Sequence, residues 1–280
     1  MNKIIVTADD FGMSEEVNDA IIDAHKNGCL THASLLANSS YFNEAVSAGK
    51  RCKNLQLGIH INLTSGKPIS IANKIPSLVN HAGYFKYGFV GLVLGYFFNK
   101  KVITQDIYYE IDSQIKKLKA HNIKISHIDS HRHIHTTPYI QKIIKKLATK
   151  HQIPRIRVIN ENLFETLKIT KSISCFFDGG IFKYLIIKLL SLFHTPLLSD
   201  IYFFSILYSC KIKPDFVKNI KHLTTKYKTI EIMLHPAFRY KEKSELTNNL
   251  TSSDLNHLKS QYRQSEYSTC YKLKEIIKNI

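Results

Sequence analysis

The chain has 280 residues, of which 44% are hydrophobic; it is therefore long enough to bury a sizeable core, and global disorder is excluded. Lysine and arginine number 39 against 22 acidic residues, and the net charge of +17 favours anionic partners, although the lysines are spread along the chain and form no basic tail. The five cysteines show no C-x-x-C spacing, so we predict neither a disulfide framework nor a thiolate zinc site.

A short apolar run opens the chain and ends in two acids. Residues 3–8 (KIIVTA) have the length and β-branched content of a buried strand, and Asp9 and Asp10 follow directly. Ser14 is then expected to cap a helix that ends near Gly28. If the strand continues through the two acids, their side chains point to opposite faces, so that one could bind a metal while the other faces a substrate. The acids could also simply cap the helix that follows.

Strands and helices alternate along most of the chain. We predict strands over residues 31–37, 55–63, 124–130, 155–159 and 229–234, a long loop over 66–83, and helices over 43–52, 103–121, 138–150, 254–262 and 270–280. This alternation is typical of βαβ units and a parallel sheet. It favours an α/β fold, a (β/α) barrel of the TIM-barrel type, in a single domain over residues 1–280. The segment 172–213 departs from the alternation, and we interpret it as an apolar insertion.

Polar clusters follow four of the predicted strands. Asp9 and Asp10 follow the first strand, His60 and Asn62 lie where LQLGIHINLT leaves the sheet, DSHRHIH follows ISHI, and His235 follows TIEIML. In a parallel barrel the carboxyl ends of the strands share one face, which carries the active site. We therefore expect these clusters to converge. Taken alone, His60 and His235 would each be more typical of polar residues with satisfied hydrogen bonds than of functional groups.

The stretch DSHRHIH contains Asp129, His131, His133 and His135 at alternating positions. In an extended segment this spacing places all four side chains on one face. Imidazoles on one face suit a divalent metal, with a neighbouring carboxylate to orient a ring N–H. A metal-scavenging tract on the surface is the alternative.

Together these stretches resemble the YdjC-like carbohydrate deacetylases, which include chito-oligosaccharide deacetylases and hopanoid-biosynthesis-associated members. The matching stretches are TADDFGMSEEVNDAI, LGIHINLTSGKP, SHIDSHRHIHTTP and EIMLHPAF. The resemblance implies a barrel related to the polysaccharide deacetylases and an enzyme that removes an acetyl group from an N-acetylated sugar with one divalent metal ion, Mg²⁺ or Zn²⁺. It implies Asp10, His60 and His131 as metal ligands and Asp9 as the catalytic base. It also implies that His235 assists the leaving group or the tetrahedral intermediate.

Other functions stay open from the sequence. A metal-dependent phosphoesterase would suit the positive charge. A basic protein that binds nucleic acid or a membrane surface is the other alternative, but no nucleic-acid-binding motif is present, so we expect no nucleic-acid partner.

The apolar run 181–208 is typical either of core or of a wall for a lipid-linked sugar at a membrane surface, with Lys183 and Lys188 at that surface. Charged residues and a proline interrupt this run, so we do not expect it to span a membrane. The apolar run at the N-terminus is too short for a signal peptide. We expect a cytoplasmic protein, with peripheral membrane contact through the apolar insertion and a homodimer as open alternatives.

Overall fold

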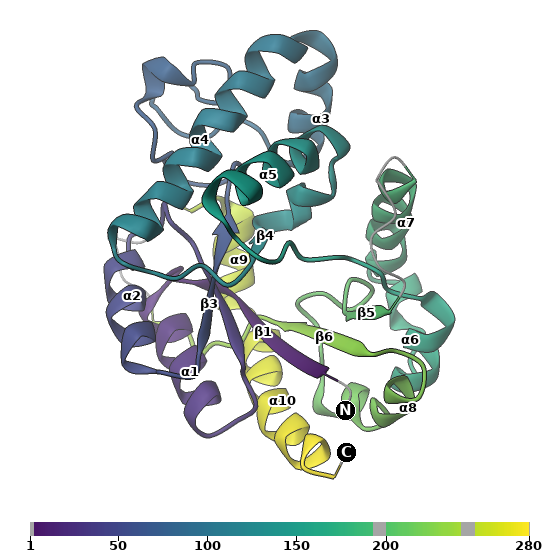
Figure 1. Cartoon of the computed structure of the whole chain (residues 1–280). Coiled ribbons are helices and arrows are strands. Elements are labelled where there is room, and N and C mark those ends of the chain that lie inside the picture. Colours follow the sequence, from purple (N-terminus) through teal and green to yellow (C-terminus); the bar gives the residue numbers. More distant parts are fainter. Residues whose placement is uncertain (1–2, 193–199, 242–249, 280) are drawn as a thin grey trace.

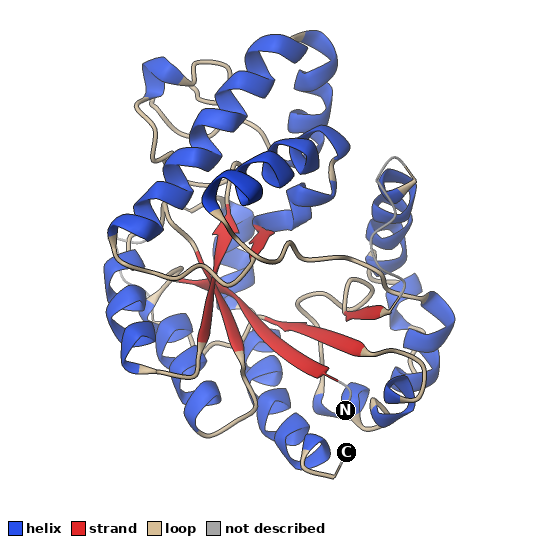
Figure 2. Cartoon of the chain, viewed as in Figure 1, coloured by secondary structure: helices blue, strands red, loops and turns tan. Residues whose placement is uncertain are grey.

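The computed structural model describes residues 3–192, 200–241 and 250–279, which form a curled parallel sheet surrounded by helices (Figure 1). Within these ranges the sheet has six strands in the order β4-β3-β2-β1-β6-β5 (Figure 2). The strands are β1 (Lys3–Phe11), β2 (His32–Leu35), β3 (Gln56–Ile61), β4 (Ile128–Ser130), β5 (Ile201–Phe204) and β6 (Thr229–Leu234). The helices are α1 (Glu15–Lys26), α2 (Phe42–Arg51), α3 (Phe89–Phe98), α4 (Lys100–Ala120), α5 (Pro138–His151), α6 (Leu163–Thr170), α7 (Gly180–Ser191), α8 (Lys221–Thr224), α9 (Ser252–Lys259) and α10 (Gln261–Ile277).

Strand β1 lies in the middle of the sheet and is buried over most of its length. It runs parallel to β2 and β6, and Thr7 stands opposite His32 on one side and Met233 on the other. A parallel strand that is covered on both faces needs a nearly continuous apolar sequence, which KIIVTA provides. The predicted strand at the start of the chain is therefore confirmed, and β6 has the predicted bounds.

The helices cover the sheet from several sides (Figure 1). Helix α1 packs against β1, α2 and α10, whereas α4 packs against β3 and α5. The start of α1 is as predicted: the Ser14 hydroxyl oxygen accepts a hydrogen bond from the backbone N–H of Val17 at 3.2 Å. Ser14, and neither of the preceding acids, therefore caps this helix.

The predicted strand at residues 155–159 does not form. Its contact with β4 is a single bridge from Ile156 to Ile128, and on the other side the backbone N–H of Phe203 in β5 donates to the Asn160 carbonyl at 3.2 Å. The segment thus lies between β4 and β5 without regular pairing, and the side chains of Arg155 and Arg157 pair with the carboxylates of Glu231 and Asp9. The parallel α/β class is confirmed, and the described strands form a curled six-stranded sheet, a half-barrel, which is consistent with the expected TIM-barrel-like fold; closure into a full barrel stays a prediction.

The segment 172–213 contributes β5 to this sheet, although its sequence departs from the strand–helix alternation. Parallel pairs such as Tyr202 with Ile230 join β5 to β6. The same segment contains α7, which projects away from the sheet (Figure 1) and packs against residues 174–176 and 131–136. Residues 193–199 of the apolar run 181–208 lie outside the described residues.

Candidate active site

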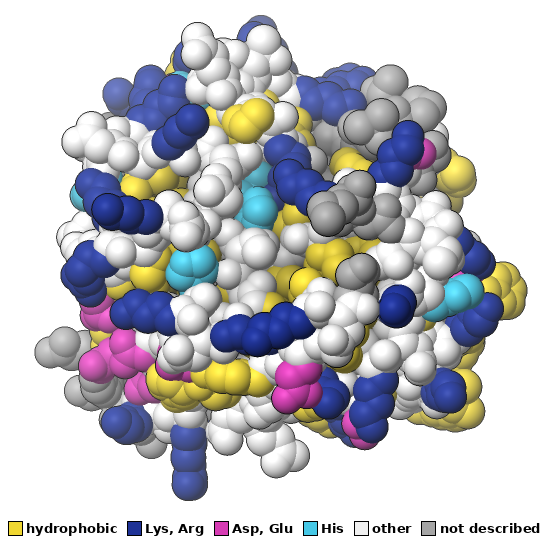
Figure 3. Space-filling view, turned by 60° about the horizontal axis from the view of Figure 1, so that its bottom comes forward, with side chains coloured by type: hydrophobic (Ala, Val, Ile, Leu, Met, Phe, Trp, Pro, Cys, Tyr) yellow, Lys and Arg dark blue, Asp and Glu magenta, His cyan; other side chains and the backbone are white. Residues whose placement is uncertain are grey.

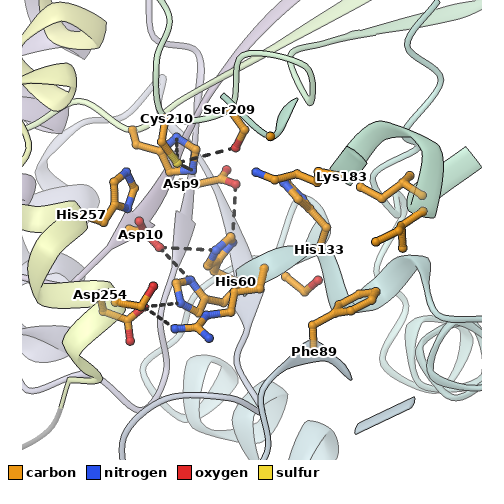
Figure 4. Close-up of a pocket in the computed structure, with 18 of the residues that line it drawn as sticks. Asp9, Asp10, His60, Phe89, His133, Lys183, Ser209, Cys210, Asp254 and His257 are labelled. Carbon is orange, nitrogen blue, oxygen red and sulfur yellow. Dashed lines mark hydrogen bonds and ion pairs between the residues drawn. The ribbon is translucent and has the colours of Figure 1, made fainter. Parts of the chain in front are cut away.

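A cavity of about 540 Å³ opens where the carboxyl ends of β1, β3 and β6 meet (Figure 4). Its lining includes all five residues that the sequence singles out, Asp9, Asp10, His60, His131 and His235. The predicted convergence of these residues is therefore correct. Each of them is buried.

Both acids at the end of β1 face this cavity. Asp10 has a left-handed backbone with φ of 65°, and the register of β1 against β2 shifts between Ala8 and Phe11. The strand is therefore not regular through Asp9 and Asp10, so the alternation that would point their side chains to opposite faces does not apply. Asp tolerates the left-handed region better than most residues, and backbone strain of this kind gathers at functional sites.

Asp10, His60 and His131 bring their ligand atoms within 4.8 Å of one another. Asp10 Oδ1 lies 3.6 Å from His60 Nε2 and 3.2 Å from His131 Nδ1. The other ring nitrogen of His60 lies 2.7 Å from Asp129 Oδ1, which fixes the ring so that Nε2 faces Asp10. One carboxylate oxygen and two imidazole nitrogens, oriented in this way, fit a single divalent metal ion with positions left for other ligands.

The charges around this cluster also suit a cation. Burial by itself would raise the pKa of Asp10, but Arg263 and His131 hold it well below the usual range. Burial would lower the pKa of His131, but Asp10 and Asp254 raise it to about 9. Two carboxylates thus hold a positive charge on the ring between them, and a metal ion would replace that proton, because metal ligands bind in their deprotonated forms.

Asp9 is held by an arginine that lies in the interior. Two terminal nitrogens of Arg157 donate to the two oxygens of Asp9, each at 2.7 Å. Arg157 also lies 2.6 Å from Asp129 and 2.9 Å from Glu231, and it is fully buried. This bidentate pair fixes the plane of the Asp9 carboxylate. The guanidinium counters the negative charge that three neighbouring carboxylates bring into the interior.

His235 follows β6, which neighbours β1 on the side away from β3 and β4. Its backbone N–H donates to Glu266 Oε2 at 2.5 Å, and its ring Nδ1 lies 3.2 Å from the same oxygen. Cys210 Sγ lies 3.8 Å from the same ring. Burial alone would lower the pKa of His235, but Cys210 and Glu266 raise it well above the usual value. A histidine that keeps its proton in this position can act as an acid toward a group in the cavity.

The three histidines of DSHRHIH do not share one face. The chain turns at His131 into a 3₁₀ segment, η2 (His131–Thr136), in which Arg132 and His133 have positive φ. His133 lines the cavity, whereas His135 Nδ1 lies 2.5 Å from Ser130 Oγ. All three rings are buried, so both the extended arrangement and the alternative of a surface tract are wrong.

Several residues of the site come from C-terminal helices and were not predicted. Asp254 Oδ1 in α9 lies 3.1 Å from His131 Nε2, and Arg263 in α10 donates to Asp10 at 2.5 Å. Glu266 follows one turn after Arg263, and the ring of His257 lies 5.3 Å from that of His235. Arg157 alone carried a signal in the sequence, because a charged residue stood inside the apolar run RIRVI.

The fold and the cavity define an α/β protein with a buried carboxylate–histidine cluster, which could hold a metal ion, at the carboxyl edge of a parallel sheet. The sequence model of the family described as YdjC-like protein matches residues 3–274. The chain therefore belongs to the YdjC-like family, as the resemblance of its motifs implied.

Curated relatives agree with this family. The chain is 38% identical over 152 residues to a carbohydrate deacetylase of Brevibacillus brevis, an alignment that covers 54% of this chain and 58% of that protein. It is 34% identical over 191 residues to a carbohydrate deacetylase of Thermoanaerobacter pseudethanolicus, covering 65% and 73% of the two chains. A carbohydrate deacetylase of Vibrio parahaemolyticus is 26% identical over 239 residues, covering 84% and 78%. The matched part of the chain thus spans less than two thirds of the length of the Brevibacillus protein and more than two thirds of the length of each of the other two proteins.

A solved structure is similar over the whole chain. It is described as that of a candidate cellobiose-phosphate cleavage protein from Enterococcus faecalis V583. The two structures superpose with a TM-score of 0.69 at 28% sequence identity, covering 100% of this chain and 95% of that one.

Proposed function

We propose that this protein removes the acetyl group from an N-acetylated sugar by metal-dependent hydrolysis. The observation that carries the proposal is the meeting of Asp10, His60 and His131 with Asp9 and His235 around one cavity. This set offers ligands for a cation, a base and an acid, which hydrolysis of an amide requires. The names of the relatives support a carbohydrate as the acetylated molecule. We further propose that residues 1–280 act as a single domain.

In this proposal Asp10, His60 and His131 hold one divalent metal ion. Carboxylate oxygen suits Mg²⁺ and Zn²⁺, and two imidazole nitrogens favour Zn²⁺. When bound, the cation supplies Lewis acidity toward the acetyl carbonyl and the attacking water. Asp129 keeps the His60 ring in the orientation that binding needs, and Asp254 does the same for His131.

Asp9 takes the proton from the attacking water. A carboxylate has about four lone-pair sites, so the two bonds from Arg157 leave sites free for that proton. Because Arg157 fixes the plane of the carboxylate, the free sites have a constant direction. The base is therefore positioned before the substrate binds.

His235 gives a proton to the departing amine, which is a poor leaving group in its unprotonated form. Its raised pKa keeps the ring protonated at neutral pH, and Glu266 holds the ring by two contacts. Asp9 as the base and His235 as the acid thus take complementary roles in one site.

A phosphoesterase is the second candidate, and one observation favours it. Arg132 and Lys183 line the same cavity, and Lys183 extends into it beside His133 (Figure 4). Such cations suit a phosphorylated substrate.

One panel of substrates separates the two candidates. The purified protein with added Zn²⁺ or Mg²⁺ is incubated with N-acetylated mono- and oligosaccharides and with matched sugar phosphates, while released acetate and phosphate are both measured. We expect acetate and no phosphate. Phosphate release without acetate would replace the proposal by the second candidate.

A further inference from the structure

Two helices beside the cavity expose apolar stripes. On α7 the stripe consists of residues three or four positions apart, which therefore lie on one helical face. They are Phe182, Leu185, Leu189 and, directly after the helix, Leu192, and their side chains are 68%, 56%, 59% and 76% exposed. On α3 the stripe consists of Val90, Leu94, Phe97 and Phe98, with exposed fractions of 64%, 50%, 76% and 87%. Of its ten residues α3 buries Leu92, and α7 buries Gly180 and Ile187. Isolated exposed apolar residues are ordinary, but two stripes of this size indicate a surface that binds another molecule or a membrane.

Both helices form part of the cavity wall. Phe89 at the start of α3 lines the cavity (Figure 4), and so do Phe182, Ile186 and Ile187 of α7. The two helices stand at the same end of the molecule (Figure 1). A molecule or membrane that covers the two stripes therefore also faces the opening of the cavity.

The charges on these helices are of one sign. The sequences of α3 and α7 contain no acidic residue. Lys188 lies within α7, and Lys100 and Lys101 follow α3 after Asn99, whereas Lys183 of α7 lines the cavity. On the face drawn in Figure 3, Lys and Arg side chains are spread widely, with hydrophobic side chains visible between them. Apolar side chains bordered by lysines are typical of helices that lie on an anionic lipid surface.

We propose that α3 and α7 dock this protein on an anionic lipid bilayer, so that the cavity opens toward an acetylated sugar carried by a membrane lipid. The substrate part of this inference rests on the proposed function, whereas the docking part does not. Within the residues described, no helix is long and apolar enough to span a membrane, so the contact is with the surface of the bilayer.

A second copy of the chain fits these helices less well. A symmetric contact would repeat the same surface on both subunits, so the lysines of one copy would face those of the other with no acid in either helix to pair with them. It would also cover the cavity mouth. An anionic bilayer supplies the opposite charge and can supply the substrate itself.

The test uses a double variant, Phe97→Ser with Leu189→Ser, one residue from each stripe. Neither residue lines the cavity. Phe164→Ser on α6 is the matched control, because Phe164 is 79% exposed and belongs to neither stripe. Binding to phosphatidylcholine vesicles with and without phosphatidylglycerol is measured by co-sedimentation at low and high salt. Acetate release is measured from a lipid-linked N-acetylglucosamine in the same vesicles and from a water-soluble N-acetylated chito-oligosaccharide.

We expect the natural protein and Phe164→Ser to bind the anionic vesicles, with loss of binding at high salt, and the double variant to bind at least about tenfold more weakly. The double variant should lose acetate release from the lipid-linked sugar and retain it on the water-soluble one. Equal vesicle binding by all three proteins, absence of binding, or a dimer that the double variant dissociates would each overturn the docking surface. Vesicle binding without acetate release from either sugar would support docking and contradict the proposed function.

Discussion

Asp10, His60 and His131 owe their arrangement to three different strand ends, and the metal site they are proposed to form can be tested one ligand at a time. Replacing His60 or His131 with Ala should lower the metal content of the purified protein to near zero, because two ligands rarely retain a divalent ion. Elemental analysis after dialysis measures this. His222→Ala, a half-buried histidine on α8, is the control and should leave the content unchanged. Full metal content in both ligand variants would contradict the assignment.

Asp9 belongs to the same strand end but is assigned a different role. Asp9→Asn removes the proton acceptor and keeps the size of the side chain, so turnover should fall by a factor on the order of 10²–10⁴. Metal content and the circular dichroism spectrum should stay close to those of the natural protein. Near-normal turnover of the variant would show that Asp9 is no base.

His235 is tested by the leaving group and by pH. His235→Gln should slow hydrolysis of an N-acetyl sugar strongly and an activated aryl acetate far less, because a good leaving group needs no acid. The His235 ring faces Glu266, Cys210 and His257. Because the pKa of His235 is raised, the ring keeps its proton at neutral pH and loses it only as the pH rises through that raised pKa. The natural protein should therefore lose activity on the basic side, and the variant should lack this limb. Equal losses on both substrates would instead indicate oxyanion stabilisation.

At the residue scale, the side chains that directly follow strands could be predicted from the sequence. The side chains that bond to them and fix their orientation could not. Asp9 and His60 were found because polar residues at the ends of apolar runs are unusual. Asp254, Arg263 and Glu266 lie on helices with ordinary polar sequences, and their contacts with β1, η2 and β6 span gaps in the chain that no local pattern encodes. The turn at His131 was missed because alternating histidines are equally compatible with an extended segment.

Among the elements, α4 and α5 are joined by a buried carboxylate. Asp112 on α4 accepts from Lys150 at 2.9 Å, contacts His151 Nε2 at 2.7 Å and pairs with Lys116 in its own helix. Burial would raise the pKa of Asp112, but Lys116, His151 and Lys150 lower it. Asp112→Asn should therefore reduce the free energy of unfolding by about 1–3 kcal/mol at neutral pH.

The sign of the pH dependence follows from the lowered pKa. The stabilisation by Asp112 is fully present above the carboxyl pKa of the unfolded chain, about 3.9, and is lost as pH falls through the folded value. The difference between natural protein and variant should shrink at acidic pH in urea titrations. Asp215→Asn, an exposed carboxylate paired with Lys218, is the control and should change nothing measurable. A difference for Asp112→Asn that is independent of pH would contradict the charge argument.

The elements that the sequence predicted best were those with a clear period. Helices α4 and α5 and strand β6 match the predicted ranges closely, because apolar residues recur at helical spacing or form one buried run. Helix α3 was missed: its sequence FVGLVLGYFF is apolar on all sides and contains two glycines, which weaken helical propensity. The segment 155–159 looked like a strand because RIRVI alternates, but its arginines serve buried carboxylates instead of solvent.

At the scale of the whole molecule, the order of the strands places the first strand, β1, beside the last strand, β6. Strand β1 lies between β2 and β6, so Asp9 and Asp10 meet His60 on one side and His235 on the other. Alternation of strands and helices predicted a parallel sheet but could not give this order, nor that 172–213 would supply β5 at its edge. Between β4 and β5, the segment 155–160 bonds to both strands through Ile156 and Asn160 without forming a strand, which no sequence pattern displays.

The proposed function requires that Asp10, His60 and His131 hold a metal ion with which the protein hydrolyses an N-acetyl group. The most direct measurement is acetate release from an N-acetylated chito-oligosaccharide by protein stripped of metal, followed as Zn²⁺ or Mg²⁺ is added back, for the natural chain and for His131→Ala. We predict no acetate from the stripped protein, recovery in the natural chain in proportion to bound metal, and no recovery in the variant. Acetate release by the stripped protein at the full rate, or equal recovery in the two proteins, would contradict the account.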